Sequence, residues 1–198
     1  MNLNTIFFIG PQGSGKGTQA KFLAKRLDFF YWEMGGILRE VAAGESILGI
    51  RIKKLIDSGV LLQDDDLYQV VKMRLNEIPV SKGVIFDGIP RRLGQAEFLL
   101  GYLKEQGRVD FATLYVTLPK EESLARLLKR AEIEKRADDT EEKIRFRLDQ
   151  YEKETVPVLD YLKANSQFFE IDGRPSVDEV RQNINKALKL DENQKFAK

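Results

Sequence analysis

The chain has 198 residues, of which 42% are hydrophobic and 32% are charged, and its formal net charge is +1. This length and apolar content allow one sizeable domain with a packed core, whereas the balanced charge gives no electrostatic case for binding nucleic acid or an anionic membrane. The sequence contains no cysteine and no histidine, which excludes disulfides, a Cys/His zinc site, and catalysis by a Ser-His or Cys-His pair.

Targeting segments are not apparent in the sequence. The apolar run at residues 6–9 is too short for a signal peptide, and no stretch approaches the roughly 20 apolar residues of a membrane span. We therefore expect a cytoplasmic protein with neither a nucleic-acid nor a membrane partner.

Short β-rich segments alternate with longer helical ones, which predicts an α/β domain whose parallel sheet is wrapped by helices. The expected strands are, in chain order, Thr5–Ile9, Phe29–Trp32, Val84–Phe86, Phe111–Leu118 and Gln167–Ile171. The expected helices are Lys16–Leu27, Gly36–Ala43, Ile47–Asp57, Asp65–Asn76, Gly94–Glu105, Glu121–Ile133, Thr140–Lys163 and Val177–Leu188. The first and third strands are short and apolar, which suits a sheet covered on both faces.

Local signals refine this pattern. Ser176 and Glu179 form a capping box at the start of the last helix, and Pro157 is expected to kink or interrupt the long helix before it. The segments 36–66 and 130–137 contain no expected strand, so both are candidate mobile insertions over a rigid core.

The strongest motif is a glycine-rich loop between the first strand and the first helix, which reads Gly10-Pro11-Gln12-Gly13-Ser14-Gly15-Lys16-Gly17-Thr18. Glycines let such a loop curl until its N–H groups point at phosphate oxygens, and the helix N-terminus adds a favourable dipole. Lys16 would supply a positive charge to the β- and γ-phosphates. The hydroxyl comes one position later than usual, at Thr18, because Gly17 follows the lysine. A glycine-rich turn without a ligand would explain neither the lysine nor the strand-loop-helix context.

A second motif follows the third strand and reads Asp87-Gly88-Ile89-Pro90-Arg91, with Gln95 just beyond it. Asp87 could be a simple turn former, but its place beside a phosphate loop favours a Mg²⁺ site, direct or through water. Arg91 could clamp a phosphate with its planar fork or be a solvated surface arginine.

Arginines form a third pattern in the C-terminal half. Arg126 and Arg130 are four residues apart on one helix face, where like charges repel mildly unless an anion lies between them. Arg136 and Arg147 follow on either side of the next helix start. Acidic residues are interspersed, so a solvated charged face and an anion site both remain open here.

Together, these patterns resemble adenylate kinases and related nucleoside-monophosphate kinases, in order from about residue 5 to residue 180. The resemblance also draws on the Arg136-Ala137-Asp138-Asp139 segment before a long helix. It implies one P-loop kinase domain over residues 1–198, with a five-stranded parallel sheet flanked by helices. Segment 36–66 would be the insertion that binds the nucleoside monophosphate, and 130–137 would be a short lid.

The resemblance implies roles on the ATP side. Arg126 would stack on the ATP base, and the backbone of Gly173-Arg174-Pro175 would touch its adenine. Arg174 is thereby an implied ATP contact. The ATP phosphates would be held by Gly13, Ser14, Gly15, Lys16, Gly17, Thr18 and Arg130, with Mg²⁺ held by Thr18 and by Asp87, the latter through water. The implied catalytic set is Lys16, Arg91, Arg130, Arg136 and Arg147.

On the acceptor side, the resemblance implies that Arg39 grips the phosphate of AMP and that Gln95 reads its adenine. The remaining implied AMP contacts are Met34, Val60, Leu61, Leu62, Gly88, Arg91, Arg136 and Arg147.

The chain departs from the family pattern mainly at the acceptor. Glu33-Met34-Gly35-Gly36 stands where the family has Ser-Thr-Gly-Asp, so Met34 brings no hydroxyl and Gly36 no carboxylate, and Ile89 replaces an aromatic residue. The stretch from Arg130 to Arg136 is too short for a zinc-binding lid, so no zinc is expected. The expected cofactor is Mg²⁺, bound together with ATP.

The expected reaction is the transfer of the γ-phosphoryl group of MgATP to a nucleoside monophosphate, with AMP favoured. The acceptor oxygen is already ionised at neutral pH, so no general base is required, which fits the absence of histidine. A UMP/CMP-type kinase and a non-catalytic nucleotide-binding protein remain alternatives. A GTPase-like switch is disfavoured because no Asn-Lys-x-Asp motif is present. The resemblance suggests a monomer.

Overall fold

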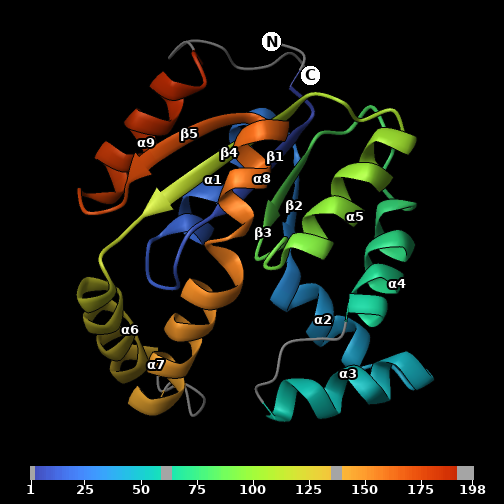
Figure 1. Cartoon of the computed structure of the whole chain (residues 1–198), viewed down its shortest axis with the longest axis horizontal. Coiled ribbons are helices and arrows are strands. Elements are labelled where there is room, and N and C mark those ends of the chain that lie inside the picture. The colour runs from blue at the N-terminus through green and yellow to red at the C-terminus, as the bar shows by residue number, and fades with distance from the viewer. Residues whose placement is uncertain (1–2, 59–63, 135–139, 191–198) are drawn as a thin grey trace.

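A computed structural model describes residues 3–58, 64–134 and 140–190 of the chain. Within these ranges, five parallel strands form one sheet in the order β2-β3-β1-β4-β5 (Figure 1). The strands are β1 Thr5–Ile9, β2 Phe30–Glu33, β3 Val84–Asp87, β4 Phe111–Thr117 and β5 Gln167–Asp172. Every strand boundary lies within one residue of its predicted position, and the predicted α/β fold with a five-stranded parallel sheet is confirmed.

The helices follow the strands in alternation. They are α1 Lys16–Leu27, α2 Met34–Ala42, α3 Ile47–Ser58, α4 Asp64–Leu75, α5 Leu93–Glu105, α6 Lys120–Glu134, α7 Glu141–Gln150, α8 Val158–Asn165 and α9 Val177–Ala187. α2 begins two residues earlier than predicted, because the low helix propensity of Gly35 and Gly36 concealed its start in the sequence. The capping box is confirmed: the Ser176 hydroxyl accepts from the Glu179 N–H, and the Glu179 carboxylate accepts from the Ser176 N–H.

The largest difference from prediction is the long helix expected at Thr140–Lys163. It consists of α7, a π-helical turn η1 (Tyr151–Thr155), and α8, which begins after Pro157. Proline has no N–H to continue the helical ladder and crowds the preceding turn, so the interruption falls where the sequence predicted it. The wider π turn was not predicted.

The sheet is covered on both faces because alternate residues of each strand point to opposite sides. Ile6 and Phe8 of β1 pack in a core with α1 and α9, whereas Phe7 and Ile9 pack in a larger core with α4, α5 and α8. All four β1 side chains are at most 3% exposed. The central strand is therefore firmly packed, and the glycine-rich loop leaves from its carboxyl end.

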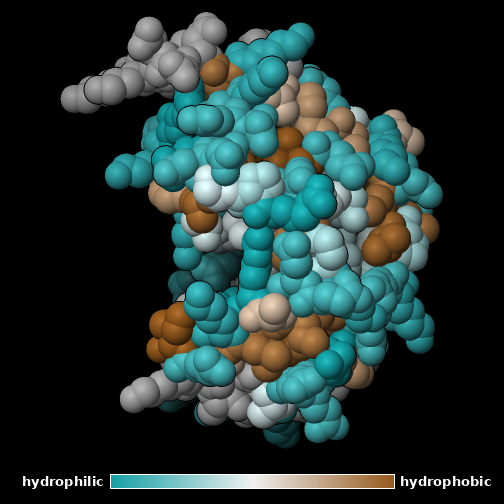
Figure 2. Space-filling view, turned by 90° about the vertical axis from the view of Figure 1, so that its left-hand side faces the viewer, coloured by the Kyte–Doolittle hydropathy of each residue, from teal (hydrophilic) through white to brown (hydrophobic). Residues whose placement is uncertain are grey.

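Two helical pairs project from the carboxyl end of the sheet on opposite sides, α6 with α7 and α2 with α3 (Figure 1). α6 and α7 share a small core of their own, built from Leu127, Ile144 and Leu148. Figure 2 shows the lower part of the molecule, where α6 and α7 lie, set off from the upper part by a hollow at the left edge of the view. Among the described residues, none of the helices combines the length and the apolar character that crossing a membrane requires.

Candidate active site

The glycine-rich loop connects β1 to α1 near the centre of the sheet. Gly10, Gly13 and Gly15 adopt φ values of +154°, +87° and +85°, a region that residues with side chains rarely occupy. Gly15 is the N-cap of α1. The first N–H groups of any helix have no intrahelical acceptor, so the loop directs backbone donors toward a site where an anion can bind.

Lys16 is the first residue of α1, and its Nζ lies 3.5 Å from the carbonyl oxygen of Pro11, at the base of the loop. Burial lowers the pKa of Lys16, the negative charge of Asp87 opposes that change, and the positive charges of Arg91 and Arg130 lower the pKa further. A partly desolvated cation among other cations is unfavourable by itself, so this arrangement suits a polyanionic ligand.

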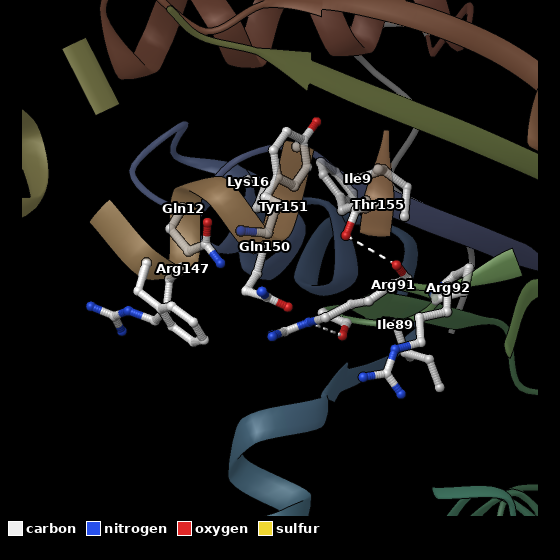
Figure 3. A pocket seen from close by; sticks show the side chains of 15 residues that line it. Ile9, Gln12, Lys16, Ile89, Arg91, Arg92, Arg147, Gln150, Tyr151 and Thr155 are labelled. Atoms are coloured by element: carbon white, nitrogen blue, oxygen red, sulfur yellow. Dashed lines mark hydrogen bonds between the residues drawn. The ribbon is translucent and has the colours of Figure 1, made fainter. Parts of the chain in front are cut away.

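A pocket opens between this loop, the segment after β3, and the α7–η1 connection. Figure 3 shows the side chains of Lys16, Arg91 and Gln150 projecting into the same opening. The pocket is lined by Phe8, Ile9, Gly10, Gln12, Lys16, Gly88, Ile89, Pro90, Arg91, Arg92, Phe146, Arg147, Gln150, Tyr151 and Thr155.

Arg91 is held firmly at the edge of this pocket. Its Nε donates to the Gly88 carbonyl at 2.9 Å, and the Thr155 hydroxyl donates to the Arg91 carbonyl at 3.1 Å. Burial lowers the pKa of Arg91, with Asp87 opposing and Arg147 adding to the change. Lys16 is thus within electrostatic reach of Arg91 and Arg130, Arg91 is within reach of Arg147, and the Asp87 carboxylate acts on both Lys16 and Arg91.

Asp87 ends β3 with 9% of its surface exposed, and it accepts a 2.9 Å hydrogen bond from the Tyr31 hydroxyl. Thr18, by contrast, is exposed in the first turn of α1. Within the described ranges, no cluster of three or more acidic, histidine or cysteine residues could enclose a metal ion. Mg²⁺ is commonly held by one or two carboxylates together with phosphate oxygens and water, so a carboxylate beside a phosphate loop fits this ion.

Arg126 lies against the loop that follows β5. Its two terminal nitrogens donate to the carbonyls of Gly173 and Arg174, at 2.9 and 3.1 Å. Arg174 in turn forms a 2.8 Å ion pair with Asp172. The structure therefore brings together the arginine and the loop that the resemblance associates with the ATP base.

The orientation of the Gln95 amide is fixed by its neighbours. Its oxygen accepts from the Arg91 backbone N–H, and its nitrogen donates to the Asp64 carboxylate, both at 2.9 Å. Because an N–H can only donate and a carboxylate can only accept, the flipped amide would lose both bonds. Gln95 is 4% exposed, which leaves little room for a different arrangement.

Met34 begins α2, and Arg39 lies in the last turn of the same helix. Arg39 forms a 3.2 Å ion pair with Glu33, in which both side chains are largely exposed. Met34 is buried, and its sulfur accepts a 3.4 Å hydrogen bond from the Trp32 indole N–H. A side chain added at Gly88 would meet the Met34 Cβ at 3.4 Å, so the start of α2 lies beside the Gly88–Arg91 segment. The predicted contacts Val60, Leu61, Leu62 and Arg136 lie outside the described residues.

Several residues in or beside the pocket were not predicted from the sequence, namely Gln12, Tyr31, Phe146, Gln150, Tyr151 and Thr155. Tyr31 could have been found from strand pairing, since β2 lies next to β3. Tyr151 and Thr155 belong to the π turn, for which the sequence gives no periodic signal.

Comparisons with known proteins agree with this geometry. Residues 8–167 match the family model described as adenylate kinase. A protein from Thermus thermophilus named adenylate kinase is 40% identical over 183 residues, covering 92% of this chain and 96% of that relative. Adenylate kinases from Micrococcus luteus and Leptospira biflexa are 37% and 36% identical over 186 residues. These alignments cover 94% of this chain, and 91% and 100% of the two relatives.

Proposed function

The chain belongs to the adenylate kinase family and is an enzyme that transfers a phosphoryl group from ATP to AMP, and from this premise we propose which of its residues bind the nucleotides and assist the transfer. The two alternative functions, a UMP/CMP-type kinase and a non-catalytic nucleotide-binding protein, are not favoured.

On the ATP side, residues 13–18 hold the phosphates, with Lys16 contributing charge from the start of α1. Arg126 and the backbone at Gly173 and Arg174 bind the adenine. The positive φ values of the loop and the hydrogen bonds of Arg126 support this assignment.

On the acceptor side, Arg39 binds the AMP phosphate, and Gln95 reads the base with Met34 and Gly88 close by. The amide of Gln95 is held in one orientation by Asp64, which supports selection of one base edge. Val60, Leu61 and Leu62 complete the proposed acceptor contacts.

The catalytic contribution is alignment and charge neutralisation. Lys16, Arg91, Arg130, Arg136 and Arg147 gather on the phosphates, and the AMP oxygen attacks without a general base because it is already ionised. The observation that carries this proposal is the set of electrostatic effects that link Lys16 to Arg91 and Arg130, and Arg91 to Arg147, at one pocket lined by Lys16, Arg91 and Arg147.

Adenylate kinases use Mg²⁺ with ATP as a general feature, and we propose that Thr18 and Asp87 hold it here, Asp87 through water. When bound, the ion neutralises charge on the phosphate oxygens. We propose that the protein is a monomer, as its resemblance to adenylate kinases suggests, and that it works in the cytoplasm.

Replacing Arg91 by lysine tests the assignment of the phosphate-binding arginines. Lysine keeps the charge but cannot form two parallel hydrogen bonds, so kcat is expected to fall about 30-fold, or about 2 kcal/mol of barrier. Steady-state kinetics with MgATP and AMP measure this effect. Arg145→Lys is the matched control, since Arg145 pairs with Glu141 on the exposed surface of α7. Normal activity in Arg91→Lys would show that Arg91 does not bind a phosphate through two parallel hydrogen bonds.

The insertion at 36–66 and the lid at 130–137 are proposed to close over the bound nucleotides, as adenylate kinase lids are known to do. A bisubstrate analogue that joins two adenosines through five phosphates would engage both segments at once. Amide hydrogen exchange with this analogue is expected to slow most in residues 36–66 and 126–147. Uniform protection along the chain would argue against closure of these segments.

A further inference from the structure

Tyr31 lies close to Asp87 because of the register between β2 and β3. The Cα of Tyr31 is paired with that of Ile85, and the Cα of Glu33 with that of Asp87. Side chains alternate along a strand, so Tyr31, Ile85 and Asp87 point to the same face of the sheet, the face that α1 covers. A residue two positions before the direct partner on the neighbouring strand is a diagonal neighbour on the same face, within reach of a tyrosine side chain.

The contact between the two side chains is a charge-assisted hydrogen bond. The Tyr31 hydroxyl donates to Oδ2 of Asp87 at 2.9 Å, and the carboxylate is largely buried. Hydrogen bonds to an ionised acceptor are roughly twice as strong as those between neutral groups. This bond therefore selects one orientation of the Asp87 carboxylate.

The first turn of α1 approaches the same carboxylate oxygen closely. A Cβ added at Gly17 would lie 3.0 Å from Oδ2 of Asp87 and 3.7 Å from the Tyr31 hydroxyl. One turn further along α1, the Lys21 amine lies 5.6 Å from the centre of the Tyr31 ring. The carboxylate oxygen thus has the tyrosine hydroxyl and the bare backbone of Gly17 as close neighbours, and a side chain at position 17 would crowd it.

We propose that Tyr31 is a positioning residue for the metal of MgATP: it engages Oδ2 of Asp87, so that Oδ1 is the oxygen left to meet the ion or one of its waters. This inference rests on the proposed metal role of Asp87. Mg²⁺ demands near-ideal octahedral geometry, so the direction of a nearby carboxylate matters. Outer partners that orient such groups typically contribute 10- to 100-fold to metal affinity or activity.

The test is Tyr31→Phe, which removes the hydroxyl and keeps the ring. Mn²⁺ serves as a paramagnetic probe in place of Mg²⁺, and electron paramagnetic resonance measures its affinity for the enzyme with ATP bound. We expect the affinity to fall about tenfold, while calorimetry in the presence of a chelator shows metal-free ATP binding within twofold of the parent enzyme. Lys21→Met, which leaves the hydroxyl in place, is the matched control and is expected to keep the parent affinity.

A second variant reaches the same carboxylate from α1. Gly17→Ala places a methyl group against Oδ2 with Tyr31 intact, and it is expected to weaken Mn²⁺ binding as well. Asp87→Asn separates the possible failures. If Asp87→Asn loses Mn²⁺ affinity but Tyr31→Phe does not, Tyr31 only packs and the inference is overturned. If Asp87→Asn also binds Mn²⁺ normally, the metal role of Asp87 itself is wrong.

Discussion

Replacing Lys16 by methionine is expected to lower kcat at least 100-fold, which corresponds to about 2.7 kcal/mol of activation barrier. The Lys16 amine is partly desolvated at the base of the phosphate loop, where a point charge acts strongly on charge that develops during the transfer. Methionine has a similar length and no charge. The measurement is steady-state turnover with MgATP and AMP, with Lys21→Met, an exposed lysine later on α1, as the control.

The melting temperature of Lys16→Met distinguishes a direct loss of catalysis from a loss of activity caused by unfolding. Burial lowers the pKa of Lys16, so the charged amine is less favourable in the nucleotide-free fold than in the unfolded chain. Removing that charge should therefore leave the melting temperature unchanged or higher. Near-normal turnover in Lys16→Met would show that the glycine-rich loop does not bind the transferred phosphates, and a large drop in melting temperature would contradict the electrostatic description of the site.

Replacing Arg108 by alanine is expected to lower the free energy of unfolding by about 3 kcal/mol, because buried carbonyls would lose the cation that donates to them. Arg108 is fully buried between α5 and β4. Its terminal nitrogens donate to the carbonyls of Lys82 and Pro79, at 2.7 and 2.8 Å, and more weakly to that of Ile78. The guanidinium thus ties the connection before β3 to the start of β4, and alanine would leave both a cavity and carbonyls without their donor.

Chemical denaturation of the Arg108→Ala variant measures the loss in the free energy of unfolding. In a thermal melt, the same loss is expected to lower the melting temperature by about 9 °C for a chain of this size. Arg145→Ala is the control, because its exposed ion pair with Glu141 contributes at most about 1 kcal/mol. Below the melting transition, kcat should stay within about twofold of the parent enzyme, since Arg108 lies outside the pocket. A stability loss below about 1 kcal/mol would mean that water replaces the guanidinium without cost.

The fold was predictable from the sequence because its strands and helices carry strong local patterns. β1 is an uninterrupted apolar run before a glycine-rich loop, and α9 begins at a capping box, so both were placed within a residue. The π turn at 151–155 was not predictable in the same way. Its geometry depends on Pro157 behind it and on the bond between Thr155 and the Arg91 carbonyl, which joins residues far apart in the chain.

Some residues of the candidate site could be predicted from the sequence, and others could not. Lys16, Asp87 and Arg91 stand in contiguous motifs, so their chemistry can be read without knowing the fold. Tyr31 lies in no motif, and its relation to Asp87 exists only through the pairing of β2 with β3. Likewise, only the folded structure shows that Asp64 is the partner of Gln95 and that Glu33 is the partner of Arg39.

The contact between Trp32 and Met34 gives the enzyme a fluorophore of its own. The chain has one tryptophan, fully buried next to Phe86, so its emission is expected at short wavelength and free of any other indole signal. A sulfur atom against the indole N–H quenches to an extent that depends on their contact, and Met34 stands at the proposed AMP site. Arrival of AMP should change the intensity more than arrival of ATP, because the indole is in direct contact with Met34. The order in which the two nucleotides bind thus becomes observable by stopped-flow on unlabelled protein.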